Sequence, residues 1–285
     1  MKLTTKVATA LIAISLCLSS CDKTGNPVIV DPTNSTTMYT MKEGNYWIYS
    51  WFTRDSSDVQ SAPVSFDSTF ITGKSTWQGK DAYATTKMEG TTDGNFNKQL
   101  MTYYASFTDD QYLISGAFLK ALLTNIPEAI SKQLNFDLPT EKWYTLADNK
   151  KDTIALLDKP IEAKGISVPN YSNVKLDLSF NILSIRKANL TEKDPMNKTK
   201  DVKAVKFELK SRINVIVNVE NVSVPLANTN LDLNTYLTFA ENIGLMKLNS
   251  PTQDLKFSFN LIAQNVDLYK YKILGRGFEL LRYKK

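Results

Sequence analysis

The chain of 285 residues has no histidine and only two cysteines, Cys17 and Cys21. Without histidine, the protein cannot use a histidine-based triad, a histidine metal site or a histidine general base. The remaining chemistries are a serine–lysine pair, paired carboxylates and calcium held by oxygen ligands. The adjacent pair Asp109-Asp110 would point to opposite faces of a strand, and a turn explains it better. We therefore assign no catalytic residue, no metal ligand and no cofactor.

The chain also lacks a strong net charge. The formal net charge is +5, and Lys2 and Lys6 supply two of these positive charges. The other lysines are spread along the chain without a long block of like charges. Because a nucleic-acid-binding surface gathers its basic residues on one face, we expect no nucleic-acid partner.

The chain offers no apolar run of transmembrane length. Lys2 and Lys6 precede the uncharged segment Val7–Leu18, and the polar sequence Asp22–Asn26 follows it closely. A transmembrane helix needs about 20 apolar residues, which this segment does not reach. A positive start, a short apolar centre and an abrupt polar end are typical of a secretory signal peptide. We therefore interpret residues 1–20 as a signal peptide and exclude them from the fold.

The end of this leader, Leu18-Ser19-Ser20-Cys21, resembles the lipobox of bacterial lipoprotein precursors. The resemblance implies that the Cys21 thiol receives a diacylglyceryl group and that signal peptidase II cuts before Cys21. It also implies acylation of the new amino group, with palmitate as the expected chain. Cys17 is the alternative, but bulky Leu16 would stand beside the cut, and Cys17 lies within the apolar run. We assign Cys21 as the lipidation site.

Lipidation would decide where the protein resides. One acyl chain binds a membrane marginally, whereas two or more anchor stably, at about 0.8 kcal/mol per buried methylene. The expected partner of Cys21 is therefore membrane lipid, in the bacterial cell envelope. Asp22 favours inner-membrane retention in enterobacterial sorting, but the rule differs in other bacteria. We expect the outer membrane rather than the inner one and leave the leaflet open.

The segment after the leader is polar and contains Pro27 and Pro32. It cannot bury much apolar surface, so we interpret residues 21–43 as a lipidated N-terminus with a flexible tether. Residues 44–285 show no internal repeat and no low-complexity linker, which favours one large β domain. A division near residues 140–152 is the alternative.

Residues 46–52 have the aromatic composition of a strand. Trp47, Tyr49 and Trp51 would share one face, and the opposite face is apolar too, so we expect burial on both sides. Aromatic residues of this kind usually serve core packing, and we prefer that interpretation. Trp47, Tyr49 and Trp51 are also candidates for contacting a glycan or lipid ligand.

Shorter strands are predicted over residues 64–72, 81–88, 100–107 and 111–115, with turn residues between them, as in a β-meander. Over residues 117–135 the apolar residues recur every four positions, which indicates one or two short helices. We expect these helices to pack on the sheet, and a mobile lid over a cavity is the alternative.

Later segments alternate apolar and polar residues, most clearly over residues 174–182, 205–219 and 255–261. Such amphipathic strands are typical of an antiparallel sheet with one wet face. The second would be about 50 Å long if straight, which predicts a bend or bulge near Ser211. The predicted class is mainly β, with a long-stranded, curved antiparallel sheet that forms a sandwich or a partial barrel.

Two exposed segments are expected around these strands. Residues 192–198 would form a loop between the first two long strands. After a last strand over residues 266–274, Gly275-Arg276-Gly277 would separate the sheet from a charged tail.

Residues 44–49 and 236–247 resemble parts of uncharacterised, β-rich exported bacterial lipoproteins. In these proteins an aromatic strand opens the domain, and a hairpin with an "IGLxK"-type turn comes late. The resemblance implies an antiparallel β fold and carries no catalytic residues. From the residues themselves, Glu241-Asn242 is expected to form a hairpin turn, with Gly244 relaxed after it.

We therefore expect a membrane-anchored envelope lipoprotein that presents a non-enzymatic binding or scaffold domain. Its partner would be an apolar ligand or another envelope protein. One alternative is a carrier that holds a lipid or other apolar ligand in a concave sheet. Another is an envelope hydrolase that uses carboxylates, and a third is an adhesion component that pairs through long strand edges.

Overall fold

The structure is a computed structural model, and every regular element that it describes is a β-strand. This agrees with the mainly β class predicted from the sequence. All described residues belong to one unit, residues 32–285. Cys21 and the helices expected over residues 117–135 lie outside the described part. The described residues are 41–88, 104–108, 110–116, 141–168, 171–219, 222–261 and 264–285.

The strands are β1 (Tyr46–Thr53), β2 (Ser65–Trp77), β3 (Lys80–Met88), β4 (Ala105–Phe107), β5 (Gln111–Ser115), β6 (Trp143–Asp148), β7 (Thr153–Ala155), β8 (Ile161–Val168), β9 (Tyr171–Asp194), β10 (Asn197–Val219), β11 (Val222–Ala240), β12 (Gly244–Ser250), β13 (Gln253–Leu261), β14 (Gln264–Ile273) and β15 (Arg276–Lys284).

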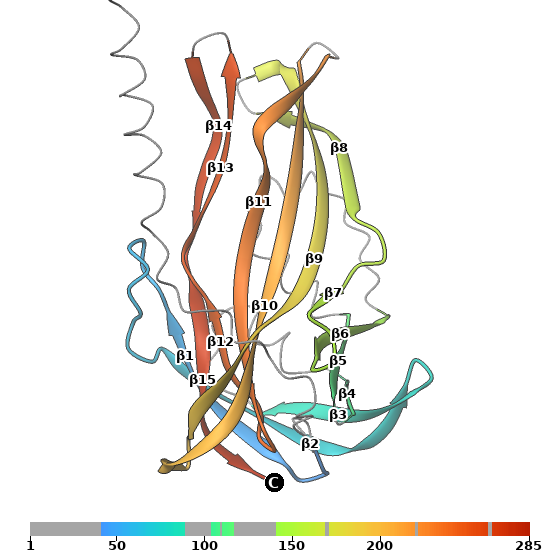
Figure 1. The fold of residues 1–285 in the computed structure, drawn as a ribbon, viewed down its shortest axis with the longest axis vertical. Coiled ribbons are helices and arrows are strands. Elements are labelled where there is room, and N and C mark those ends of the chain that lie inside the picture. Colours follow the sequence, from blue (N-terminus) through green and yellow to red (C-terminus); the bar gives the residue numbers. More distant parts are fainter. Residues whose placement is uncertain are drawn as a thin grey trace, which may run out of the picture. The chain divides into compact units, whose positions relative to one another are not determined.

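Thirteen of the described strands form one antiparallel sheet. Its order is β6-β5-β4-β3-β2-β1-β15-β12-β11-β10-β9-β7, and β8 also pairs with β9. Figure 1 shows the long strands β9, β10 and β11 running side by side. β13 and β14 form a separate two-stranded sheet. Strands from before and after residues 140–152 belong to the large sheet. The predicted boundaries of the signal peptide, the tether and the β domain stay predictions.

The two ends of the large sheet approach each other. Ser184 of β9 donates its hydroxyl proton to the carbonyl oxygen of Leu146 in β6, at 2.7 Å. Since β6 is at one end of the strand order and β9 is next to the other, the sheet is nearly closed. Of the two predicted architectures, the partial barrel is the one that forms.

The inner face of the sheet carries the core. In β10 the predicted alternation is confirmed most clearly in the second half of the strand, because Ile213, Val215 and Val217 are buried between more accessible neighbours. Side chains also meet across the interior: the rings of Tyr112 in β5 and Phe239 in β11 lie 5.2 Å apart. These contacts join strands that are distant in the sheet order.

The long strands bend at bulges, as their length predicts. The register of β10 shifts between Lys206 and Phe207 against β9, and between Asn214 and Ile216 against β11. The predicted irregularity near Ser211 is thus divided between two positions that flank it.

Two predictions about exposed segments are wrong. The expected charged tail is β15, which pairs with β1 on one side and with β12 on the other. Its charged residues stay accessible while Phe278 and Leu280 are buried. The expected loop over residues 192–198 is a tight turn at Pro195-Met196, held by a bond from the Met196 amide to the carboxylate of Asp194 (2.9 Å).

The predicted turn at Glu241-Asn242 is confirmed. It joins β11 to β12, Asn242 has a φ of 59°, and Gly244 has a φ of 93°. Left-handed backbone of this kind favours asparagine and glycine.

Candidate functional site

The three aromatic residues singled out in the sequence lie side by side in the core. Trp47, Tyr49 and Trp51 are 6%, 4% and 2% exposed. The indole of Trp47 donates to the carbonyl oxygen of Ile243 (2.8 Å), and the hydroxyl of Tyr49 donates to that of Leu245 (2.9 Å). These two bonds hold the row of Trp47, Tyr49 and Trp51 against β12 and the turn that precedes it. Their packing agrees with a core role, and contact with a ligand stays a prediction.

Beside this aromatic row runs a row of polar residues on the inner face of β2. Ser65, Asp67 and Thr69 are buried, and in the register they stand opposite Trp51, Tyr49 and Trp47 respectively. The hydroxyl oxygens of Ser65 and Thr69 and the indole nitrogen of Trp51 are buried without a hydrogen-bond partner. The inner face is therefore less apolar than the sequence alternation suggests.

The unpartnered hydroxyl of Thr69 leads to a stability prediction. Burying a hydroxyl without a partner costs about 1–3 kcal/mol, and valine has nearly the same shape. We expect Thr69→Val to raise the free energy of unfolding by about 1 kcal/mol, measured by urea unfolding. Thr76→Val, at an exposed position of the same strand, should change it by less than about 0.5 kcal/mol. A loss of stability in Thr69→Val would contradict the prediction.

A pocket of about 680 Å³ opens where β1 ends and β15 begins. It combines hydroxyl, charged and apolar side chains, which come from the β1–β2 loop and from the β14–β15 connection. Its lining residues are Thr53, Arg54, Asp55, Val59, Gln60, Ser61, Leu274, Gly275 and Arg276. We call it the loop pocket.

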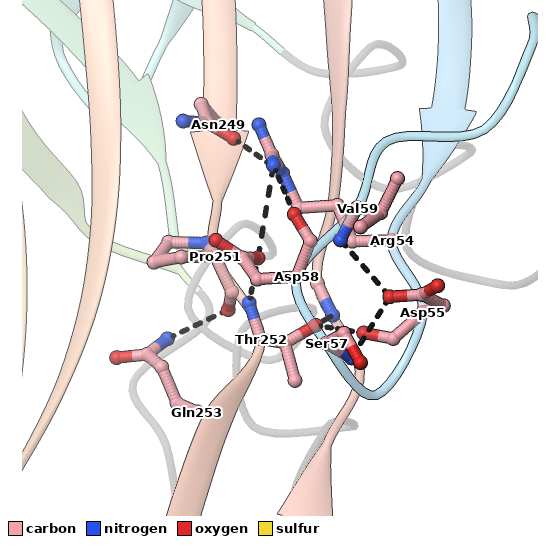
Figure 2. Close-up of polar contacts among 10 residues, drawn as sticks. Arg54, Asp55, Ser57, Asp58, Val59, Asn249, Pro251, Thr252 and Gln253 are labelled. Atoms are coloured by element: carbon pink, nitrogen blue, oxygen red, sulfur yellow. Dashed lines mark hydrogen bonds and ion pairs between the residues drawn. The ribbon is translucent and has the colours of Figure 1, made fainter.

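The β1–β2 loop is shaped by two aspartates whose carboxylates accept backbone N–H groups (Figure 2). Asp55 accepts from the amides of Ser57 (2.8 Å) and Val59 (2.9 Å). Asp58 accepts from the amide of Thr252, at 2.7 Å. The first pair of bonds closes the loop on itself, and the third ties it to the β12–β13 connection.

Thr252 links this loop to the start of β15. Its hydroxyl donates to the carbonyl oxygen of Asp55 (2.8 Å) and accepts from the amide of Gly275 (2.8 Å). The amide of Arg54 in turn donates to the carbonyl oxygen of Gly275 (2.8 Å). Three connections that are far apart in the sequence therefore form one hydrogen-bonded rim.

Arg54 stabilises this hydrogen-bonded rim from the outer face of the sheet. Its Nε donates to Asn249 Oδ1 (3.1 Å), and its Nη1 donates to the carbonyl oxygen of Asp58 (2.8 Å). The guanidinium carbon lies 5.5 Å from the centre of the Phe52 ring. Figure 2 shows the guanidinium group turned toward Asn249 and Asp58. Arg54 thus has a structural role at the pocket.

Arg276 lies on the opposite face from Arg54. It pairs with Thr53 in the β1–β15 register, as Phe278 pairs with Trp51, and paired residues share a face. This is the inner face, so the row of Trp47, Tyr49 and Trp51 continues into Thr53 at the pocket. Burial lowers the pKa of the Arg276 guanidinium, but arginine stays charged in proteins.

Glycines on both sides bring Arg276 close to β12. A Cβ on Gly275 would lie 2.5 Å from the carbonyl oxygen of Ser250, and one on Gly277 would lie 2.5 Å from the Phe52 ring. Only glycine allows this approach. The sequence Gly275-Arg276-Gly277 marks this site in the amino-acid sequence. Its composition alone, however, predicts a break between the last strand and a charged tail.

Cys21 lies outside the described residues, so its lipidation stays a prediction. Within the described part there is no group of three or more histidine, cysteine, aspartate or glutamate side chains that could hold a metal ion. No helix of the described residues has the length and hydrophobicity needed to span a bilayer.

No family model and no curated protein matches the chain. Among solved structures, a "putative lipoprotein" from Parabacteroides distasonis is 12% identical, and the match covers 87% of this chain and 99% of that one with a TM-score of 0.37. A "putative exported protein with YmcC-like fold" from Bacteroides fragilis is 10% identical, with 88% and 100% covered and a TM-score of 0.35. Identities and TM-scores this low establish neither a shared fold nor a shared function.

Proposed function

We propose that the protein is a lipid-anchored lipoprotein of the bacterial cell envelope that presents a non-enzymatic, β-rich binding or scaffold domain. The observation that carries this proposal is the leader, in which Lys2 and Lys6, the apolar segment Val7–Leu18 and the sequence Leu18-Ser19-Ser20-Cys21 follow in order. Together these features match the requirements for export and for acylation of a cysteine.

The described domain supports a role in binding or scaffolding rather than hydrolysis. Two of its buried carboxylates, Asp148 and Asp194, fix the backbone and neighbouring side chains. Asp148 accepts from Gln111 Nε2 (2.7 Å) and from the amide of Lys150 (2.9 Å). Asp194 accepts from the amide of Met196 and from the hydroxyl of Tyr283 (3.1 Å). Carboxylates used in this way favour structural roles over acid–base catalysis.

Removal of the Cys21 thiol tests the anchor. We expect wild-type protein to sediment with membranes after a carbonate wash and to incorporate an alkynyl palmitate label. Cys21→Ser should lose the label completely and should be released or accumulate uncleaved, because without acyl chains no stable anchor remains. Membrane fractionation and in-gel detection of the label measure both effects.

Cys17 provides a matched control for this experiment. Cys17→Ser removes a thiol from the same leader but leaves the Leu18–Cys21 sequence intact, so labelling and sedimentation should not change. Full labelling of Cys21→Ser, or loss of labelling in Cys17→Ser, would refute the assignment of Cys21.

A further inference from the structure

Four segments that are far apart in the sequence meet where β1 begins and β15 ends. The hydroxyl of Tyr283 donates to Asp194 Oδ2 (3.1 Å), which joins the β9–β10 turn to β15. The indole of Trp47 donates to the carbonyl oxygen of Ile243 (2.8 Å), and Trp47 pairs with Tyr283 in the β1–β15 register. Figure 1 shows the β9–β10 turn and the end of β15, marked C, at the same end of the ribbon. We call residues 41–45, 193–203, 240–244 and 282–285 the basic end.

Two further contacts connect the segments of the basic end. The amide of Glu241 donates to the carbonyl oxygen of Lys203 (2.8 Å), so the β11–β12 turn lies beside β10. A Cβ on Gly244 would lie 3.4 Å from Met41 Cε, so the residues that precede β1 lie beside the start of β12. The charged side chains of these segments are therefore gathered at one end of the β domain.

The basic end has an excess of positive charge. It contains eight lysine and arginine side chains against four aspartate and glutamate side chains, while the two signs nearly balance in the rest of residues 21–285. Many lysines elsewhere in the described part form ion pairs, as Lys210 does with Asp232 (3.2 Å) and Lys187 with Glu208 (3.0 Å). Four exposed lysines of the basic end form no ion pair with a described residue: Lys42, Lys198, Lys203 and Lys284. We call them the four unpaired lysines.

Two of the four carboxylates at the basic end are already engaged. Asp194 is 4% exposed and accepts from the amide of Met196 and the hydroxyl of Tyr283. Asp201 forms an ion pair with Lys193 (2.5 Å). The unpaired lysines are exposed point charges from several segments. This arrangement suits an extended anionic surface better than a single small ligand.

The position of the predicted tether makes a membrane the expected surface. Residues 21–40 separate the proposed anchor at Cys21 from Met41, where the described chain begins. A flexible coil of about 20 residues has its ends about 25 Å apart. The 24 residues of β9 extend over about 80 Å along the strand. Because the tether joins the domain at the basic end, this end is held closer to the bilayer than the far end of β9.

We propose that the basic end docks on the anionic lipid headgroups of the membrane that holds Cys21, with the four unpaired lysines as its contacts. The inference rests on the proposed anchor and adds an orientation to it, in which the far end of β9 points away from the bilayer. A second copy of the chain fits this surface less well, because two basic ends would repel each other.

Energy transfer from the domain to the bilayer tests this orientation. The acylated protein is reconstituted in vesicles of phosphatidylcholine, or of phosphatidylcholine with about one third phosphatidylglycerol, that carry an acceptor dye on a lipid headgroup. Cys17 leaves with the leader and Cys21 is acylated, so an introduced cysteine is the one free thiol for the donor dye. The donor is attached to Thr199→Cys, an exposed position of the basic end, or to Ser172→Cys, an exposed position at the far end of β9. We expect phosphatidylglycerol to raise the transfer from residue 199 and not from residue 172.

Two variants with the same net charge identify the docking surface. The first replaces the four unpaired lysines: Lys42→Gln, Lys198→Gln, Lys203→Gln and Lys284→Gln. Each lysine beside an anionic surface favours docking by about 5-fold, so this variant should lower the ratio of docked to undocked protein at least about 10-fold. The control replaces four exposed lysines outside the basic end that also form no ion pair with a described residue: Lys74→Gln, Lys80→Gln, Lys151→Gln and Lys159→Gln. It should dock like wild type, and circular dichroism melting checks that both variants are folded.

The proposal is supported if transfer from residue 199 rises with phosphatidylglycerol, falls again in about 0.5 M salt, where exposed charges are screened, and is lost in the first variant alone. Equal transfer with and without phosphatidylglycerol, an equal rise at residue 172, or an equal loss in both variants would overturn it. Transfer that depends on the density of protein on the vesicles would also overturn it and would indicate contact between two copies. Flotation with neutral vesicles measures the Cys21 anchor separately, so failure of the anchor and failure of docking are distinguishable.

Discussion

Gly277→Ala is expected to lower the free energy of unfolding by about 3 kcal/mol or more. An added Cβ would overlap the carbonyl oxygen of Leu248 and lie 2.5 Å from Phe52 Cζ. Overpacking in a fixed core costs about 1–3 kcal/mol, and here one obstacle is backbone that cannot rotate away. Because β15 joins β1 to β12, moving it would strain the pairing on both sides. Urea unfolding followed by far-UV circular dichroism measures the loss.

Gly73→Ala is the control for this substitution. Gly73 lies in β2, where an added Cβ would meet no atom within 4 Å and the backbone has no positive φ, so alanine should be neutral or slightly stabilising there. Gly277→Ala combined with Phe52→Ala should stay strongly destabilised, because the Leu248 carbonyl remains. If Gly277→Ala unfolded like Gly73→Ala, the close packing of β15 against β12 would be wrong.

The fold class followed from the sequence because side-chain alternation is a local signal. Val205, Phe207 and Leu209 alternate with charged residues, and the structure buries them on one face of β10. The same reasoning failed at β15, where Gly277 and the charges at Glu279 and Arg282 look like the end of a chain. What places β15 inside the sheet is its pairing with β1, more than 200 residues earlier, and local periodicity does not record such partners.

The loop pocket could not be predicted from the sequence, for a similar reason. Its rim joins the loop after Thr53, the connection at Thr252 and the start of β15 at Gly275. Each of these segments alone has only the composition of a turn. The row of Trp47, Tyr49 and Trp51 was visible because alternation within one strand is enough to define it. Its extension to Thr53 and Arg276 required the register between two distant strands.

Phe239→Ala should be the most damaging truncation in the interior. Phe239 is fully buried, and its ring lies 5.2 Å from Tyr112 and 6.0 Å from Phe207. Truncating a buried phenylalanine costs about 3–5 kcal/mol, since both transfer energy and a cavity are involved. Phe66→Ala, at a position that is 54% exposed in β2, provides the size-matched control and should cost less than about 1 kcal/mol.

A double-mutant cycle with Tyr112 tests whether this contact closes the sheet across its interior. If Tyr112 and Phe239 pack as the ring distance indicates, their coupling energy should be about 0.5–1.5 kcal/mol. The control cycle pairs Phe239→Ala with Phe66→Ala and should be additive within about 0.5 kcal/mol. Additivity in the Tyr112 cycle would mean that β5 and β11 do not meet, and the sheet would then be open rather than nearly closed.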